Sequence, residues 1–286
     1  MQKGEAIMET LDAAEIFELY TFQTRNINEG ENKAHTKEGA QALGFRGSIV
    51  GGALVYGQMI RPLIQRYGEQ WLGCHWFDLR FKSPAYDDDW VTSSITPDTD
   101  SGQQHAFSVR ATNEAGQELI AMRTYIPDTP PAVDALAGLE PIDWEGERVE
   151  GSWERMELNR PFRRFRWKLS LSQQLGYCER THEDVAIFRE GATPPVHPGL
   201  VMAHGSFAVQ HQFVMPFWIH TGSMILTRGI IRVGDEVELR CVPIEKWKRK
   251  DNEWVKFYQV YVVNGQPLVE VWKSSIITFV PRSQPT

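Results

Sequence analysis

The feature that most constrains the fold is a repeated order of segments: an apolar helical segment followed by about four short strands occurs twice. In residues 44–68, apolar side chains recur at spacings of three and four, at Ile49, Ala53, Tyr56, Ile60 and Leu63. Residues 196–218 show a weaker pattern of the same kind, which predicts a helix from about residue 200 to residue 214. Glycines lie near the start of both segments and indicate close approaches of the backbone.

Each helical segment is followed by sequence that is rich in β-branched and aromatic residues and is broken by turn signals. Four such segments lie in residues 75–127 and four in residues 216–281. Asn-Glu-Ala-Gly at 113–116 and Asn-Gly-Gln-Pro at 264–267 predict hairpin turns at matching places. One helix and about four strands, found twice, is typical of the hotdog fold. We therefore predict the α+β class with two tandem hotdog domains (a double hotdog), each a long central helix wrapped by a curled antiparallel sheet.

The stretch between the halves is rich in proline and acidic residues and has no sustained periodicity. It is predicted to be a linker that crosses the surface of the sheet. The predicted division is an N-terminal hotdog domain at 1–130, a linker at 131–152 and a C-terminal hotdog domain at 153–286. Two fused hotdogs already satisfy the pairing that single copies achieve as dimers, so a monomer and a homodimer both stay open.

The composition disfavours several partners and compartments. The net charge of −7 argues against nucleic acid and acidic membrane surfaces. The basic residues at 160–168 are interpreted as a solvated strand or linker face, with an anchor for a phosphorylated carrier such as coenzyme A as the alternative. Three cysteines far apart indicate neither a zinc site nor a disulfide framework. No run approaches the roughly 20 apolar residues of a membrane span, and the N-terminus lacks the pattern of a signal peptide, so a cytoplasmic protein is predicted.

A motif precedes and enters the first helical segment. Its residues are Asn32, His35, Ala40, Gly44, Phe45, Ile49, Val50 and Gly52. Their order resembles the hydratase motif of the MaoC-like dehydratases and R-specific enoyl-CoA hydratases. In that family a loop with an Asp, an Asn and a His precedes a helix that begins with an apolar-apolar-His-Gly run. Residues 80–91 and 232–239 resemble the strand junction of the same family, so the resemblance extends over nearly the whole chain.

The sequence departs from the family motif at two positions. The catalytic Asp of the family lies five residues before the His, and Gly30 stands at that place here. Glu31 is therefore the carboxylate expected to act with His35. Gly51 stands where the family has a His at the helix start, and His204 is expected to keep that His in the second half.

The resemblance implies a set of site residues. The expected catalytic residues are His35, Glu31 and Asn32, with the carboxylate and the imidazole sharing the catalytic water. The expected substrate-binding residues are Gly51, Gly52, His204 and Gly205. For Gly52 there is also a physical reason, because the first N–H groups of a helix have no partner within the helix and can hold a thioester oxygen. Turn formation by Asn32 and helix packing at Gly51 are the ordinary alternatives.

The second half holds four histidines that must be weighed as metal ligands, namely His197, His204, His211 and His220. Their spacings do not reproduce a known zinc motif, and no nearby carboxylate completes a site. No metal and no cofactor is therefore predicted. His204 and His220 fit core or interface positions as well as catalytic ones, and His197 fits a turn.

The predicted function is a lyase that hydrates 2-enoyl thioesters or dehydrates 3-hydroxyacyl thioesters by carboxylate and histidine acid-base catalysis. Coenzyme A is the expected carrier, ahead of a carrier protein. The first alternative is a hotdog acyl-CoA thioesterase, although neither predicted helix start places an Asp or Glu toward a cleft. The second alternative is a non-catalytic protein that binds acyl thioesters and whose motif has decayed, as Gly30 suggests.

Overall fold

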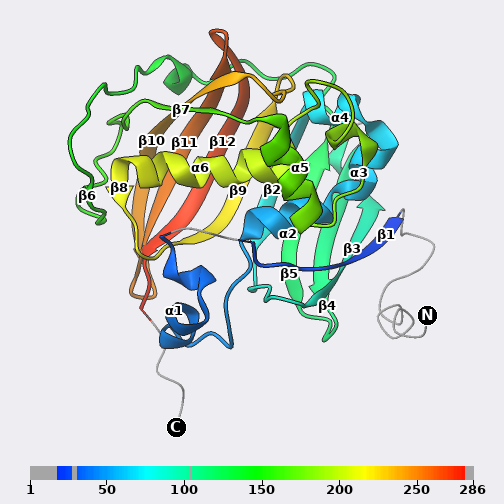
Figure 1. Ribbon diagram of the computed structural model, residues 1–286, viewed down its shortest axis with the longest axis horizontal. Helices are drawn as coiled ribbons and strands as arrows, with labels where there is room; N and C mark the ends of the chain where they lie inside the picture. Colours follow the sequence, from blue (N-terminus) through cyan, green and yellow to red (C-terminus); the bar gives the residue numbers. More distant parts are fainter. Residues whose placement is uncertain (1–17, 28–30, 104, 281–286) are drawn as a thin grey trace.

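One ten-stranded sheet dominates the structure (Figure 1), a computed structural model that describes residues 18–27, 31–103 and 105–280. Its strands are β1 (Glu18–Gln23), β2 (His75–Phe81), β3 (Trp90–Pro97), β4 (Phe107–Asn113), β5 (Glu118–Tyr125), β7 (Phe165–Lys168), β9 (Ile219–Thr227), β10 (Glu236–Arg249), β11 (Asn252–Val263) and β12 (Gln266–Thr278). Their order is β1-β3-β4-β5-β2-β9-β12-β11-β10-β7, and all neighbours are antiparallel. Each half of the sequence contributes one side of the sheet.

The two halves join at the centre of the sheet, where β2 runs beside β9. Phe77 lies opposite Ile225, and Leu79 lies opposite Ser223. Because this pairing is continuous with the pairing inside each half, the halves form one hydrogen-bonded unit. The predicted α+β class with curled antiparallel sheet is confirmed.

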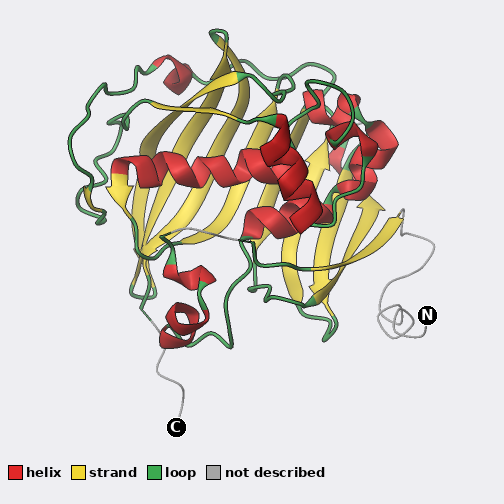
Figure 2. Ribbon diagram, in the orientation of Figure 1, coloured by secondary structure: helices red, strands yellow, loops and turns green. Residues whose placement is uncertain are grey.

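The long helices lie on one face of the sheet (Figures 1 and 2). The helices are α1 (Lys37–Ala42), α2 (Gly52–Met59), α3 (Arg61–Tyr67), α4 (Glu69–Gly73), α5 (Leu171–Arg180) and α6 (Pro198–Gln212). Helix α6 agrees with the predicted helix of the second half. A single long helix in the first half was the wrong expectation, because α2 ends at Met59 and α3 begins at Arg61. Pro62 in the first turn of α3 lacks an N–H and cannot continue the hydrogen bonds of α2.

The two predicted hairpin turns are present. Asn264 and Gly265 both have positive φ, 51° and 76°, which is the backbone of the tight turn that suits the twist between β11 and β12. Gly116 has a φ of 73° between β4 and β5. Strand β1 and helix α5 were not anticipated, although Ser170 and Gln173 form the capping box that marks a helix start.

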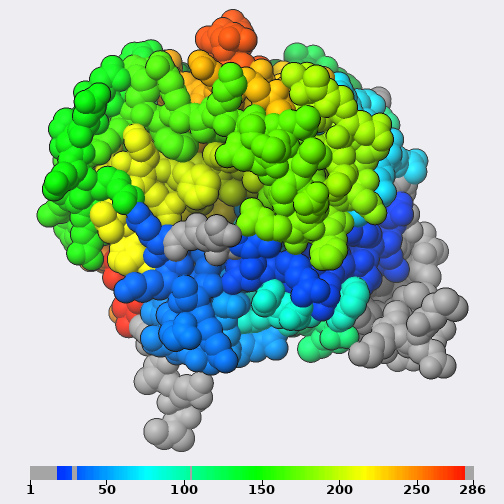
Figure 3. Space-filling view, in the orientation of Figure 1, coloured from blue at the N-terminus to red at the C-terminus, as the bar shows by residue number. Residues whose placement is uncertain are grey.

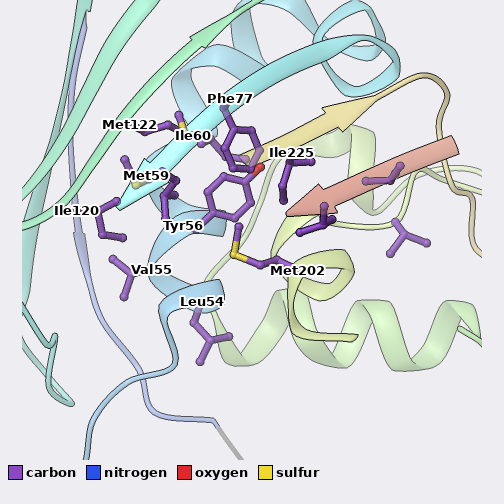
Figure 4. Packing of buried hydrophobic residues seen from close by; sticks show 14 of the residues in the cluster. Leu54, Val55, Tyr56, Met59, Ile60, Phe77, Ile120, Met122, Met202 and Ile225 are labelled. Carbon is purple, nitrogen blue, oxygen red and sulfur yellow. The ribbon is translucent and has the colours of Figure 1, made fainter. Parts of the chain in front are cut away.

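The core lies between the helices and the sheet, and it includes residues of both halves. Tyr56 of α2 packs against Phe77 of β2 with 5.0 Å between the ring centroids. Figure 4 shows Met202 of α6 and Ile225 of β9 beside this pair. All four side chains are buried. Burying such large apolar groups together stabilises the junction of the halves, at about 1.5–3 kcal/mol for each fully buried side chain.

The connection between the halves crosses the other face of the second half of the sheet. Leu136 and Leu139 pack against the buried side chains of Val242 and Tyr258. The fully buried carboxylate of Glu270 accepts hydrogen bonds from the backbone N–H of residue 134 and from the Tyr258 hydroxyl, and it pairs with the guanidinium of residue 228. A surface-crossing linker is thus confirmed, whereas the division at 130 and 152 stays a prediction.

The basic stretch at 160–168 forms the edge strand β7 and the turn before it. Arg164 and Arg166 both pair with Glu238 of β10, and Arg164 also pairs with Asp143. These ion pairs and the pairing of β7 with β10 support the interpretation of the stretch as a strand face.

Candidate functional site

A cavity of about 600 Å³ opens where the two halves meet. Helix α2 contributes Gly52 and Val55 to its wall, and β2 contributes Phe81. The second half contributes His220 of β9 and Ile276 of β12. Apolar side chains make up most of the lining, so the interior suits a hydrocarbon chain with a few polar contacts near one end.

The first turn of α2 supplies the polar contacts that the cavity needs for an oxygen atom. Gly51 is the N-cap and has no side chain that can bond the free N–H groups. In the described parts of the chain, no hydrogen bond is made by the backbone N–H of Gly52 or of Ala53. A Cβ at Gly52 would overlap the ring of Phe81, so only glycine fits between the helix start and β2. The arrangement is an open pair of donors beside an apolar cavity, at the positive end of a helix dipole.

The loop before α2 is tied to the second half of the chain. The side-chain N–H of Asn32 donates to the backbone oxygen of Trp218 at 2.9 Å, and its Oδ1 accepts from the N–H of Ala34 at 3.1 Å. The backbone N–H of Lys33 donates to the oxygen of Pro216 at 2.9 Å. In Figure 3, residues 31–48 (blue) adjoin the yellow surface of the second half. Asn32 is buried and acts as a turn former that also crosses the seam.

His35 is not itself among the residues that line the cavity, but it contacts Ile49, which is, and this contact decides its chemistry. Nδ1 of His35 is 2.7 Å from the backbone oxygen of Ile49, a residue that lines the cavity. A carbonyl oxygen only accepts hydrogen bonds, so Nδ1 carries the proton and Nε2 carries the lone pair. Burial lowers the pKa of His35, so the ring is neutral near pH 7 and Nε2 is a base.

Glu31 and His35 do not meet. The carboxylate of Glu31 pairs with Arg148 at 2.5 Å, and both side chains are more than a third exposed. Both residues lie in the described part of the chain, and no hydrogen bond joins the Glu31 carboxylate to the His35 imidazole there. Gly30, the position of the family Asp, lies outside the described residues.

The second half holds a copy of this site, and backbone hydrogen bonds show which residues correspond. The N–H of Val50 donates to the oxygen of Ala85 at 2.9 Å, and the N–H of Val196 donates to the oxygen of Ile231 at 2.8 Å. Val196 follows Val50 by the same number of residues as Ile231 follows Ala85, and this number is the offset between the two halves. This offset therefore relates the start of α2 to the start of α6.

The correspondence corrects the expectation for His204. Gly51 and His197 have almost the same backbone angles, φ −56° and ψ 129° against φ −59° and ψ 130°, and each is the N-cap of its helix. His197 is thus the counterpart of Gly51. His204 lies two turns inside α6, where its Nδ1 bonds the oxygen of Leu200 and its ring stacks on Trp167 with 4.0 Å between centroids. The backbone hydrogen bonds and dihedral angles therefore identify His197 as the counterpart of Gly51, whereas the His-Gly pair at 204–205 led to the wrong residue.

Gly205 also lies away from the cavity. Its backbone oxygen accepts a hydrogen bond of 2.6 Å from the side-chain amide of Gln259 on β11. A Cβ at this position would come within 2.5 Å of the Gln259 side-chain oxygen. Gly205 thus permits close packing of α6 on the sheet, and neither His204 nor Gly205 lines the cavity at the seam.

The copy in the second half is nearly closed. Its cavity is about 40 Å³. Pro198 stands where Gly52 stands in the first half, and proline has no N–H to offer. The next N–H, that of Gly199, already donates to Nδ1 of His197 at 3.1 Å. The second helix start therefore lacks both the open donors and the volume of the first.

The loop before α6 supplies a buried ion pair. Glu183 is fully buried, and its carboxylate is 3.4 Å from Nε2 of His197 and 3.8 Å from the guanidinium of Arg61. The neighbouring His182 is exposed and has a positive φ. In Figure 3, the green to yellow-green surface of residues 170–195 adjoins the blue surface of the first half.

Across the described residues, no group of three or more His, Cys, Asp or Glu side chains is placed to hold a metal ion. The helices that the structure describes include none that is long and apolar enough to cross a membrane.

No protein family model matches the sequence, and no curated protein does. Solved structures do match. One is assigned as a MaoC domain dehydratase from Chloroflexus aurantiacus, with 12% identity, 93% of this chain and 95% of that chain covered, and a TM-score of 0.63. A second is the Rv0216 protein of Mycobacterium tuberculosis, described as a double hotdog, with 9% identity, 91% and 95% covered, and a TM-score of 0.57.

A third is assigned as an oleoyl thioesterase from Lactobacillus plantarum, with 11% identity, 95% and 99% covered, and a TM-score of 0.52. At these identities the likeness concerns the fold, which dehydratases and thioesterases share. Together with the joined sheets and the two helices on one face, it shows that the chain has the double hotdog fold found in MaoC-like dehydratases.

Proposed function

We propose that the protein hydrates 2-enoyl thioesters and dehydrates 3-hydroxyacyl thioesters at the seam cavity. The observation that carries the proposal is the combination of a neutral His35 with a basic Nε2 and the open N–H groups of Gly52 and Ala53. A thioesterase needs a nucleophile or a carboxylate at the same helix start, and neither α2 nor α6 has an acidic residue in its first turn.

One histidine is sufficient for the proton balance. The thioester oxygen accepts hydrogen bonds from the α2 N–H groups, which stabilise the negative charge that develops on it. His35 takes one proton from water as the water oxygen bonds to C3 and the C2–C3 double bond becomes an enolate. His35 then delivers that proton to C2, and the imidazole is neutral again. Dehydration is the reverse sequence.

In this mechanism the other loop residues act as supports. Asn32 holds the loop against the second half through Trp218, so the position of His35 depends on both halves. Glu31 holds the same loop through Arg148, whose guanidinium also donates to the backbone oxygen of Gln210 at 2.8 Å. The carboxylate role first expected for Glu31 in the chemistry is therefore reassigned to loop attachment in this proposal.

Coenzyme A is the proposed carrier because the cavity mouth offers aromatic and cationic groups. Trp247 and Trp254 stack with 5.5 Å between their centroids, and both line the cavity. Arg249 also lines it, and no ion pair of Arg249 occurs within the described chain. Aromatic faces suit adenine and a free guanidinium suits phosphate.

The test follows loss of the enoyl absorbance of crotonyl-CoA and of longer enoyl-CoAs with the purified chain. We expect turnover by the natural sequence and a loss of about 10²–10⁴-fold in His35→Ala. His182→Ala is the matched control, because His182 is exposed and is not among the residues that line the cavity. Absence of turnover in the natural sequence, or full activity in His35→Ala, would exclude the proposal. Release of free thiol in the same samples would instead indicate a thioesterase.

A further inference from the structure

His220 brings a second imidazole to the seam cavity, and it comes from the half that lacks the hydratase-like loop. The residue lies on β9 and lines the cavity together with Gly52. Its ring meets the ring of Phe81 edge to face, with 4.8 Å between the centroids. Phe81 in turn packs against the α-carbon of Gly52, as the overlap with any Cβ there shows. One aromatic ring therefore separates His220 from the helix start that holds the thioester oxygen in the proposed reaction.

The orientation of the His220 ring is set by two partners of the same nitrogen. Nε2 is 2.7 Å from the hydroxyl oxygen of Ser223 and 3.2 Å from the backbone oxygen of Gly222. The backbone oxygen of Gly222 can only accept a hydrogen bond, and the hydroxyl oxygen of Ser223 can accept one as well. Both contacts are therefore hydrogen bonds when Nε2 carries the proton. Nδ1 then carries a lone pair, and no hydrogen bond to Nδ1 occurs among the residues described.

The surroundings keep this ring neutral. Burial, together with the charge of the nearby Lys273, lowers the pKa of His220 well below its ordinary value. A neutral ring with a free lone pair accepts a hydrogen bond and does not attract anions. The same offset that relates the two helix starts places Cys74 where His220 would be in the closed copy, and the thiol of Cys74 faces the backbone oxygen of Pro127 at 3.8 Å. At this position the open site therefore has an imidazole acceptor, whereas the closed copy has a thiol.

We propose that Nδ1 of His220 accepts a hydrogen bond from the hydroxyl group at C3 of a 3-hydroxyacyl thioester, and from the attacking water in the reverse direction. This inference rests on the proposed function. With the thioester oxygen held at the start of α2, C3 lies two carbon–carbon bonds beyond the thioester carbon. In this binding mode C3 points into the cavity, toward Phe81 and His220. The substrate class is then an acyl thioester with a hydroxyl at C3, and His220 distinguishes it from a saturated acyl thioester of the same length.

The experiment compares two ligands by calorimetry, 3-hydroxybutyryl-CoA and butyryl-CoA. It uses the full chain with His35→Ala, so that the first ligand is not turned over. We expect the hydroxylated ligand to bind about 10-fold more tightly, as one buried hydrogen bond allows. In the background with His220→Phe added, this preference is expected to disappear, while the affinity for butyryl-CoA stays within about 2-fold.

Two further variants keep the test decisive. His220→Asn places an amide oxygen near the position of Nδ1, so we expect it to recover part of the preference. His211→Phe, on the exposed end of α6, is the control for removing an imidazole elsewhere. Thermal unfolding of each variant checks that the fold is kept.

The possible failures are distinguishable. Equal losses for both ligands in His220→Phe, or an unchanged preference, overturn the role of His220 and leave the proposed reaction intact if crotonyl-CoA is hydrated. If neither ligand binds to any variant, the role of His220 and the proposed reaction are both contradicted. Should His220→Phe fail to fold, the result with His220→Asn decides, because a preference fully lost or fully kept there contradicts the inference.

Discussion

The backbone oxygen of Ile49 accepts a hydrogen bond from Nδ1 of His35 at 2.7 Å, and this contact determines which nitrogen of the imidazole is basic. Ile49 also lines the cavity, so the residue that orients the base is part of the wall that holds the substrate. The proposed chemistry therefore depends on the loop and the helix start folding against each other.

The pH dependence of hydration should report the protonation of His35. Burial lowers the pKa of His35 below the ordinary value of about 6.5, so the basic form persists below that pH. We expect the acid limb of kcat/KM for crotonyl-CoA to be centred below about pH 6.5. An acid limb centred above pH 7 would contradict the assignment of His35 as the base. In His35→Ala, the residual rate should lose this limb.

Gly52→Ala should damage the site and the packing together. A Cβ at residue 52 overlaps the ring of Phe81, which must move into the cavity. We expect a loss of about 1–3 kcal/mol in the free energy of unfolding and at least a 10-fold loss in kcat/KM. Gly176→Ala, inside α5, is the matched control, because no atom lies within 4 Å of its Cβ position. That variant should be neutral or slightly more stable, by up to about 1 kcal/mol, in urea unfolding.

Glu31→Gln tests loop attachment against acid-base chemistry. The Glu31–Arg148 pair is exposed, and pairs of that kind contribute about 0–1 kcal/mol. We expect kcat/KM to fall less than about 5-fold in Glu31→Gln and by a similar factor in Arg148→Gln. The double variant should be no worse than Arg148→Gln alone, because Arg148→Gln already removes the Glu31–Arg148 pair. A loss of 100-fold or more confined to Glu31→Gln would show that the carboxylate takes part in the reaction.

Lys273 should make stability rise with pH. Burial lowers its pKa to about 7, against an ordinary value of about 10.4, so the unfolded chain binds the proton more tightly than the folded one. The free-energy cost of burying the charged Lys273 side chain is fully present below pH 7 and disappears as the pH rises toward 10. Relative to Lys273→Met, the natural chain should gain on the order of 3 kcal/mol over that range in chemical unfolding. Lys256→Met, at a partly exposed lysine on β11, should show no such gain.

Much of the architecture follows from local pattern. Helical spacing around Tyr56, strand-rich stretches after each helix and the turn at Asn264 all act over a few residues, and their order is enough to indicate a double hotdog. The same local reasoning led to a single first helix, because apolar spacing continues through Ile60 while Pro62 breaks the hydrogen bonds. It also missed β1, a short edge strand that is defined by its partner β3.

Local sequence patterns are enough to predict the order of elements, the loop with Asn32 and His35, and the glycines at the start of α2. The contact of Glu31 with Arg148, the place of His204 inside α6 and the position of His220 at the cavity become known only from the folded chain. The physical reason is distance along the chain: the hydrogen bond from Asn32 to Trp218 joins residues 186 positions apart. Periodicity and motif spacing describe neighbours in sequence, whereas a site at a seam is made by surfaces that meet only after both halves have folded.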